Sequence, residues 1–255
     1  MFDLTPQSGP VAAGTQPHDL TAPLPDYLER YYWWAYLRPA SLRIFDHRAV
    51  VDAILWGQYR RLCDAALAEI APGTHVLQLA CVYGDLSQCL ANHLGPSGRL
   101  DIVDIAPIQI ANIKAKVKGM PWANAQVADA AEAGAQTYDT VLAFFLLHEL
   151  PDAQKTRVVD AALAQVRPGG QAIFIDYARP WRLHPLRPVM AAVFGLLEPF
   201  AKTLWRRDIK SFAADAADYD WTREARFGGL YQKTIATRRD DRDPQPAQLE
   251  PNIPN

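Results

Sequence analysis

Hydrophobic and polar positions divide the chain into short apolar runs that alternate with segments of helical periodicity. The apolar runs predict buried strands over residues 75–80, 99–104, 125–127, 140–145 and 171–176. The segments between them predict helices over residues 84–94, 107–118 and 152–166. Strands that alternate with helices of this length indicate a parallel sheet covered by helices on both faces.

Segments with little capacity for burial lie at both ends of the chain. Residues 1–25 are rich in Pro, Gly, Thr and Ala, and residues 238–255 carry an Asp-Asp-Arg-Asp-Pro stretch, so both are predicted to be disordered. Residues 26–237 then form one domain. Within it, residues 26–70 predict a helical cap, whose aromatic run over 31–36 is expected to wall a ligand pocket or to pack in the core.

Glycine-containing turns mark the second half of the domain. The Arg-Pro-Gly-Gly sequence at 167–170 predicts a turn before the fifth strand. The Phe-Gly-Gly sequence at 227–229 predicts a hairpin that leads into a final edge strand.

Composition narrows the protein class. The 255 residues are 49% hydrophobic, which is ample for a core, and the net charge of −2 gives no general reason to expect nucleic acid. The three cysteines form no Cys-x-x-Cys pair, which suits a reducing cytoplasm better than a disulfide scaffold. The first 25 residues lack a secretory signal pattern, and no run of about 18 apolar residues is long enough to span a bilayer. We therefore expect a cytoplasmic location.

The segment after the first strand carries the main sign of ligand binding. There Gly84 opens a helix, and Asp104 follows near the end of the second strand. In βαβ units of this kind, backbone N–H groups at the helix start face a nucleoside and the acid accepts its ribose hydroxyls. The turn itself reads Ala-Cys-Val-Tyr-Gly at 80–84, where a glycine-rich sequence is usual.

Two further segments resemble a known family. Residues 138–152, which include Leu-His-Glu-Leu-Pro-Asp, are similar to the fourth-strand segment of class I S-adenosylmethionine-dependent methyltransferases that act on quinones. Residues 166–170 are similar to the turn before the fifth strand in that family. The altered sequence at 77–85 and the aromatic run at 31–36 resemble, within this superfamily, the methyltransferase-like enzymes of bacterial rhodoquinone biosynthesis.

The resemblance extends over roughly residues 27–237 and implies an α/β, Rossmann-like class I methyltransferase fold. Its mostly parallel seven-stranded sheet would carry helices on both faces, N-terminal aromatic helices and an amphipathic helical insertion. The implied reaction converts ubiquinone to rhodoquinone by replacing a ring methoxy group with an amino group. S-adenosylmethionine would be the amino donor, with Mn²⁺ or a similar divalent metal assisting.

The resemblance also implies a set of cofactor-binding positions, with Asp129 where the family bonds the adenine amino group. These positions are Gln78, Ala80, Tyr83, Gly84, Asp104, Ile105, Asp129, Ala130 and Phe144.

Gln78 stands where nucleoside-binding relatives usually carry Asp or Glu. A carboxylate there favours the charged α-ammonium of the cofactor, because an opposite charge nearby stabilises the protonated form. An amine that attacks a quinone must first lose that proton, so a neutral glutamine favours amination, and Val82 and Tyr83 would crowd the methionyl end. The alternative is that Gln78 reflects drift in a methyltransferase loop.

His148 and Glu149 follow the fourth strand at the edge where parallel sheets open their ligand crevice. Either residue could act as a general base or a metal ligand, and His148 could equally cap a helix or fill the core. The candidate catalytic residues are therefore Gln78, Tyr83, His148 and Glu149. Metal ligands stay open among Asp104, Asp129, His148, Glu149 and Asp176, and oxygen ligands would suit Mn²⁺.

Residues 181–212 predict two short amphipathic helices, one starting at Pro188 and the second separated from it by a kink at Pro199. Basic residues and two tryptophans flank their apolar stripe, which is typical of helices in the headgroup region of a membrane. We expect contact with the bacterial inner membrane, where ubiquinone resides. A lid packed on the domain is the alternative, and a lid could also dock on lipid.

Two other functions stay open at this stage. An ordinary C- or O-methyltransferase acting on a quinone or lipid would use the same cofactor. A catalytically silent partner in quinone biosynthesis would keep the fold without turnover, and the unusual glycine-poor turn favours it. Nucleic acid is not expected as a substrate, because the basic residues gather on 181–212 rather than beside the pocket.

Overall fold

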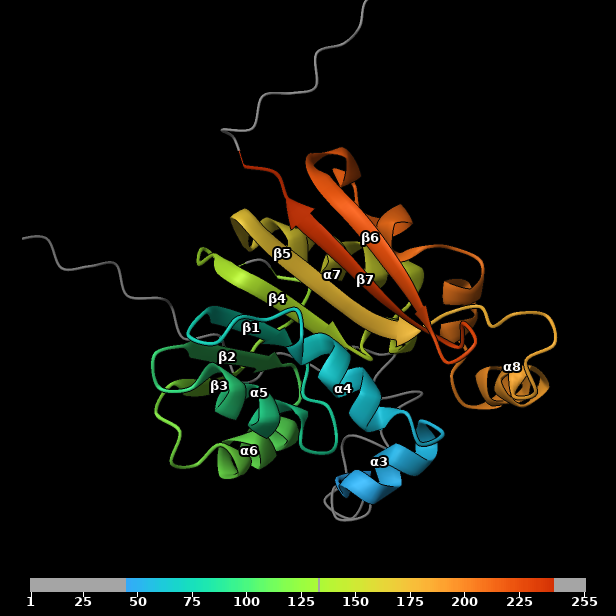
Figure 1. Ribbon diagram of the computed structural model, residues 1–255, viewed down its shortest axis with the longest axis horizontal. Helices are drawn as coiled ribbons and strands as arrows, with labels where there is room; N and C mark the ends of the chain where they lie inside the picture. The colour runs from blue at the N-terminus through green and yellow to red at the C-terminus, as the bar shows by residue number, and fades with distance from the viewer. Residues whose placement is uncertain (1–44, 133, 241–255) are drawn as a thin grey trace, which may run out of the picture.

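Seven strands form one sheet in the order β3-β2-β1-β4-β5-β7-β6 (Figure 1). The computed structural model describes residues 45–132 and 134–240. The first five strands are parallel, and β7 runs antiparallel to both β5 and β6. The strands are β1 His75–Leu79, β2 Arg99–Asp104, β3 Ala123–Val127, β4 Tyr138–Phe144, β5 Val166–Tyr177, β6 Tyr219–Arg226 and β7 Tyr231–Arg238.

Helices cover both faces of this sheet. The α-helices are α3 Arg48–Ile54, α4 Tyr59–Leu67, α5 Leu86–Leu94, α6 Pro107–Lys116, α7 Asp152–Ala164 and α8 Arg187–Leu196. Short 3₁₀ helices are η2 Leu147–Glu149, η3 Ala201–Trp205, η4 Ile209–Phe212 and η5 Ala216–Asp218. None of the helices in the described ranges meets the length and hydropathy needed to cross a bilayer.

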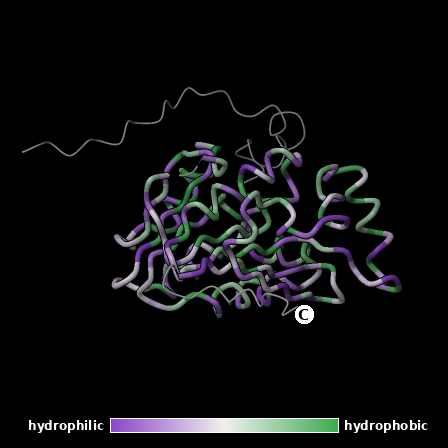
Figure 2. Tube along the Cα trace, turned by 90° about the horizontal axis from the view of Figure 1, so that it is seen from above, coloured by the Kyte–Doolittle hydropathy of each residue, from purple (hydrophilic) through white to green (hydrophobic). Residues whose placement is uncertain are grey.

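The alternation of side chains along each strand divides the core into two clusters. On one face, Val76 and Ile102 pack with residues of α4, α5 and α6, which lie in front of the sheet in Figure 1. On the other face, Leu77 and Val141 pack with α7. Figure 2 shows hydrophobic (green) positions running through these layers and along α8 at the right of that view. The predicted two-sided parallel sheet is confirmed.

The five predicted strands and the helices predicted over 84–94, 107–118 and 152–166 are present, with bounds that differ by a few residues. The second helix predicted within 181–212 is instead the two 3₁₀ helices η3 and η4. Residues 26–44 of the predicted cap lie outside the described residues.

Two further predictions, one of a turn and one of an edge strand, are wrong in detail. Residues 167–170 lie inside β5, because its start pairs with Tyr138 before a register shift between Tyr138 and Thr140. The final strand is not an edge strand, because β7 lies between β5 and β6.

The edge strand at this end of the sheet is β6, which the apolar pattern did not predict. Its sequence, Tyr-Asp-Trp-Thr-Arg-Glu-Ala-Arg, is mostly exposed and so carries no apolar run. The predicted disordered tail does not start at residue 238, because Arg238 is the last residue of β7 and donates a hydrogen bond to Val166 O. The predicted disordered segment 1–25, the aromatic run and the rest of the tail lie outside the described residues.

Candidate functional site

A cavity of about 440 Å³ opens at the carboxyl ends of β1, β2, β4 and β5. Its position follows from the topology, because the chain after β1 leads to β2 on one side and the chain after β4 leads to β5 on the other, which leaves a crevice at the ends of β1 and β4. The segments after β1, β2, β3 and β4 form the base of the cavity, and residues of α3 and α8 form its sides. The volume lies within the range of small-molecule sites.

The turn after β1 brings backbone against the cavity without the usual glycines. Ala80 adopts the left-handed conformation, with φ of 66°, at a position where only glycine is free of steric cost. Cys81 N–H then donates to Asp104 Oδ2 at 2.7 Å. Tyr83 lines the cavity and accepts a hydrogen bond from Gln109 Nε2 at 3.2 Å. The strained turn is held by bonds to neighbouring segments, as is common at binding sites.

Asp104 ends β2 and holds the loops on either side. Its Oδ1 accepts the Ala106 N–H at 2.8 Å, while Oδ2 accepts the Cys81 N–H. Burial raises the pKa of the Asp104 carboxyl to about 6, although the N–H groups of Cys81 and Ala106 oppose that shift. The Cys81 thiol also donates to this carboxylate, and a remaining lone pair can accept a ligand hydroxyl.

Gln78 lies beneath the turn rather than on the cavity wall. Its side chain is fully buried, and its Nε2 donates to Ala80 O at 3.0 Å. Its Oε1 is buried without a hydrogen-bond partner among the described residues. The position therefore carries a neutral amide with one unused acceptor directly under the strained turn.

His148 is the centre of a charged group on the opposite wall. Its Nδ1 lies 3.0 Å from Asp176 Oδ1 in an ion pair whose direction does not make a hydrogen bond, and its Nε2 lies 3.7 Å from Glu149 Oε1. Burial opposes protonation of His148, but the negative charges of Asp176 and Glu198 outweigh it and raise the pKa to about 9. The imidazole is therefore a proton donor at neutral pH.

Most of the predicted site residues meet in this cavity. Those that line it are Ala80, Tyr83, Asp104, Ile105, Asp129, Ala130, Phe144, His148 and Glu149. Gln78 and Gly84 do not line it; Gly84 N–H donates to Asp46 Oδ1 at 3.1 Å. Asp176 does not line the cavity; it is buried and forms an ion pair with His148.

The structure adds residues that the sequence reasoning did not place in the site. Glu198, just past α8, lines the cavity, and burial raises the pKa of its carboxyl while the His148 charge opposes that shift. Phe145 forms an aromatic wall with Tyr177, whose position at the end of β5 was expected at this edge, with ring centroids 5.3 Å apart. Phe145 also has a positive φ of 51°, a strain that the amino-acid sequence does not reveal.

A metal does not fit the side chains that are described. Across residues 45–132 and 134–240, no group of three or more His, Cys, Asp or Glu side chains is arranged to hold a metal ion. The divalent metal implied by the resemblance is therefore not supported by this donor set.

Comparisons with known proteins agree with this geometry. Residues 76–170 match the family model described as a methyltransferase domain. The chain is 25% identical over 189 residues to a demethylmenaquinone methyltransferase of Bacillus cytotoxicus, covering 72% of this chain and 76% of that protein. It is 26% identical to the corresponding enzyme of Listeria welshimeri, covering 62% of this chain and 65% of that protein, just under two thirds of its length.

A solved structure shares the fold. The O-methyltransferase family protein from Burkholderia thailandensis superposes with a TM-score of 0.57 at 18% identity, covering 76% of this chain and 60% of that one. The sheet order and these matches show the fold of class I S-adenosylmethionine-dependent methyltransferases. The proteins similar to this chain include enzymes named for quinone methylation.

Proposed function

We propose that this protein is an S-adenosylmethionine-dependent transferase acting on the ring of a membrane quinone, and that it replaces a ring methoxy group with an amino group. The observation that carries the amination is the neutral, fully buried Gln78 beneath the cofactor turn. The resemblance to rhodoquinone biosynthesis enzymes supplies the substrate, ubiquinone, and the product.

The residues that line the cavity are suited to bind S-adenosylmethionine. Asp104 keeps a lone pair at the end of β2 that would accept a ribose hydroxyl, and Ile105 lies beside it on the wall. Asp129 lines the cavity after β3 and would accept the adenine amino group. The co-substrate supplies an α-amino group and a sulfonium methyl, and the residues around it decide which one reacts.

Gln78 favours the amino group as the reacting atom. A carboxylate buried at this position would act through a medium of low dielectric and hold the amine as an ammonium. The amide has no charge, so the amine loses its proton more readily and presents a lone pair. Gln78 does not contact the cavity, and its influence on the amine is therefore electrostatic and through the turn that it supports.

The opposite wall suits a quinone ring and its leaving group. Phe144, Phe145 and Tyr177 offer aromatic faces, and protonated His148 lies beside them. In the substitution, a C–N bond forms at the ring and the C–O bond to the methoxy group breaks. Methoxide leaves with a proton from His148 as methanol, so the ring keeps its oxidation state. Transfer is complete when the bond between nitrogen and the donor's α-carbon breaks by elimination. Nitrogen keeps the bonding pair and gains a proton, the donor's β-carbon loses a proton, and a double bond forms between the α- and β-carbons, so no oxidant or reductant is needed.

The first experiment supplies the purified protein with a ubiquinone and S-adenosylmethionine labelled with heavy nitrogen on its amino group, with and without Mn²⁺. Heavy nitrogen in an aminoquinone by mass spectrometry is the expected result. Gain of a methyl group would contradict amination and establish the ordinary quinone methyltransferase, which the relatives' names favour. Bound cofactor without any product would instead favour the silent partner.

Substitution of Gln78 tests the charge argument directly. We expect Gln78→Glu to raise the pKa of the bound amine by about 1–3 units and to slow amination at neutral pH at least about tenfold. The pH optimum should rise, because deprotonation then needs a higher pH. The measurement is the pH–rate profile of aminoquinone formation.

The matched control is Gln165→Glu, which also places a carboxylate at a buried glutamine. Gln165 lies at the end of α7, away from the cavity lining. It reports the cost of a buried charge to folding alone. An unchanged profile in Gln78→Glu would remove the support that Gln78 gives to amination.

A further inference from the structure

Exposed apolar side chains lie at the end of α3, in the segment before α8 and on α8, and residues of α3 and α8 also line the cavity. We call this set the mouth surface; it comprises Ile54, Trp56, Trp181, Leu183, Val189, Leu196 and Leu197. Leu183 and Leu196 are each 82% exposed and Trp181 is 61% exposed, which is unusual for side chains of this size. An apolar patch of this kind marks an interaction site.

The mouth surface is continuous with the cavity. Ile54, Trp56 and Leu197 belong to both, because they are exposed to solvent and also line the cavity. They come from the end of α3 and the end of α8, which both lie at the lower right of Figure 1. An apolar molecule that leaves this surface can therefore enter the cavity without crossing water.

Basic side chains flank the mouth surface. Residues 179–207 contain six basic residues and one acidic residue, Glu198, which faces His148 inside the cavity. Of the six, Arg207 pairs with Asp152 at 4.0 Å, and the other five have no carboxylate partner within the described part of the chain. The basic residues are Arg179, Arg182, Arg187, Lys202, Arg206 and Arg207.

We infer that the mouth surface docks on an anionic phospholipid bilayer, with α8 in the headgroup region and the cavity open toward the lipid. Apolar side chains and a tryptophan flanked by arginine and lysine are the pattern of an interfacial helix. A second copy of this chain fits less well, because an isologous contact through this surface would bring two basic rims together. Docking itself does not depend on the proposed function. Only the identity of the molecule that would pass from lipid into the cavity, a quinone, rests on it.

The test is flotation of the full chain with vesicles of phosphatidylcholine, with or without phosphatidylglycerol. We expect binding to the vesicles that contain phosphatidylglycerol, and weaker binding at high salt because salt screens the basic side chains. Leu183→Asp with Leu196→Asp should lower the vesicle partition coefficient about tenfold or more. Arg182→Gln with Arg206→Gln should weaken binding only where phosphatidylglycerol is present.

The control is Ala111→Asp, which adds one negative charge at an exposed position of α6, remote from the mouth surface. It should float like the wild type. The docking inference is overturned if the wild type does not float, or if the double leucine variant floats as well as the wild type. It is equally overturned if the wild type is a dimer that the double leucine variant dissociates, because a second copy would then cover the surface.

Turnover separates this inference from the proposed function. The double leucine variant should keep its activity on a short-chain quinone in solution and lose it on a long-chain quinone in vesicles. Wild-type flotation without any turnover would support docking and contradict the proposed function. Turnover on the short-chain quinone without flotation would support the proposed function and contradict docking.

Discussion

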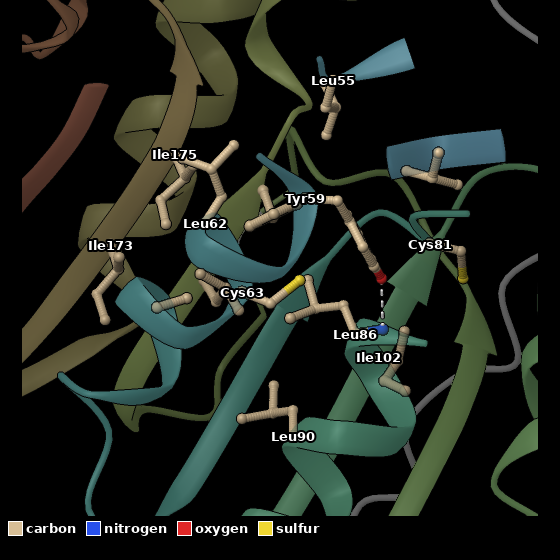
Figure 3. Packing of buried hydrophobic residues seen from close by; sticks show 14 of the residues in the cluster. Leu55, Tyr59, Leu62, Cys63, Cys81, Leu86, Leu90, Ile102, Ile173 and Ile175 are labelled. Carbon is tan, nitrogen blue, oxygen red and sulfur yellow. Dashed lines mark hydrogen bonds between the residues drawn. The ribbon is translucent and has the colours of Figure 1, made fainter. Parts of the chain in front are cut away.

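At the scale of single residues, one phenolic oxygen holds the start of a helix against its neighbour. Tyr59 is fully buried in α4, and its oxygen accepts the N–H group of Asp85 at 2.8 Å. It also accepts the N–H group of Leu86 at 2.9 Å (Figure 3). These are two of the N–H groups that a helix start leaves without an intrahelical partner. The turn after β1 therefore depends on a side chain that does not line the cavity.

Removing that oxygen should destabilise the protein. We expect Tyr59→Phe to lower the free energy of unfolding by about 1–3 kcal/mol, because two buried N–H groups lose their acceptor. The measurement is denaturant-induced unfolding at neutral pH. Tyr231→Phe is the matched control, since the Tyr231 hydroxyl is buried without a partner among the described residues and its loss should cost little. Equal losses in the two variants would contradict this account.

His148 makes stability depend on pH. Its pKa is about 9 in the folded protein against an ordinary value of 6.5, so the folded state binds the proton more tightly. The resulting stability is fully present below pH 6.5 and is lost as the pH rises through about 9. The free energy of unfolding should therefore fall across that interval in the wild type and fall less in His148→Gln. Parallel pH curves for the two proteins would show that the imidazole is not charged by its neighbours.

At the scale of elements, a buried lysine joins the start of α7 to the segment after α8. Lys155 is fully buried, and its ammonium donates to Leu150 O at 2.7 Å and to Phe200 O at 2.9 Å. A third bond reaches Asp152 Oδ1 at 3.0 Å. The ammonium thus fixes the chain that carries Glu198 relative to the wall that carries His148.

We expect Lys155→Met to loosen the segment around η3 more than the sheet. The carbonyls of Leu150 and Phe200 would lose their donor, whereas the two core clusters would keep their contacts. Hydrogen exchange should speed up most at residues 196–205. Asp152→Asn is the control, because it removes only a half-exposed ion pair that is worth little. Uniform acceleration over the whole sheet would contradict a local role.

The elements that the sequence predicted are those with a strong periodic signal. β1 and β2 follow their apolar runs closely, and the break at Pro199 separates α8 from η3 as expected. The sequence did not predict β6, because an exposed edge strand has no apolar run. It did not predict the start of β5, because a Pro-Gly-Gly sequence resembles a turn. Local patterns report burial, and these segments are set by pairing with a neighbouring strand.

At the scale of the whole molecule, the site residues that the sequence placed correctly are those that follow the ends of the parallel strands. Asp104 and His148 reach the same cavity because the carboxyl ends of parallel strands meet at one edge. Gln78 was expected at the ligand and lies beneath the turn, because the alternation along β1 directs it into the core. Glu198 could not be predicted, since its approach to His148 depends on the fold of α8 over the sheet.

Cofactor binding should stabilise the molecule as a whole, because a ligand of the folded state shifts the unfolding equilibrium by mass action. At a hundred times its Kd, S-adenosylmethionine should add about 2.7 kcal/mol, or roughly 5–10 °C in Tm. Asp104→Asn should shrink this increment because it weakens the ribose contact. Asp101→Asn, a buried acid on the same strand that pairs with Arg99 and does not line the cavity, should leave the increment unchanged. Scanning calorimetry of the three proteins with and without the cofactor makes the comparison within each protein, so the separate cost of each substitution to folding cancels. An equal increment in all three would show that the cofactor binds without Asp104, and the role assigned to the end of β2 would fail.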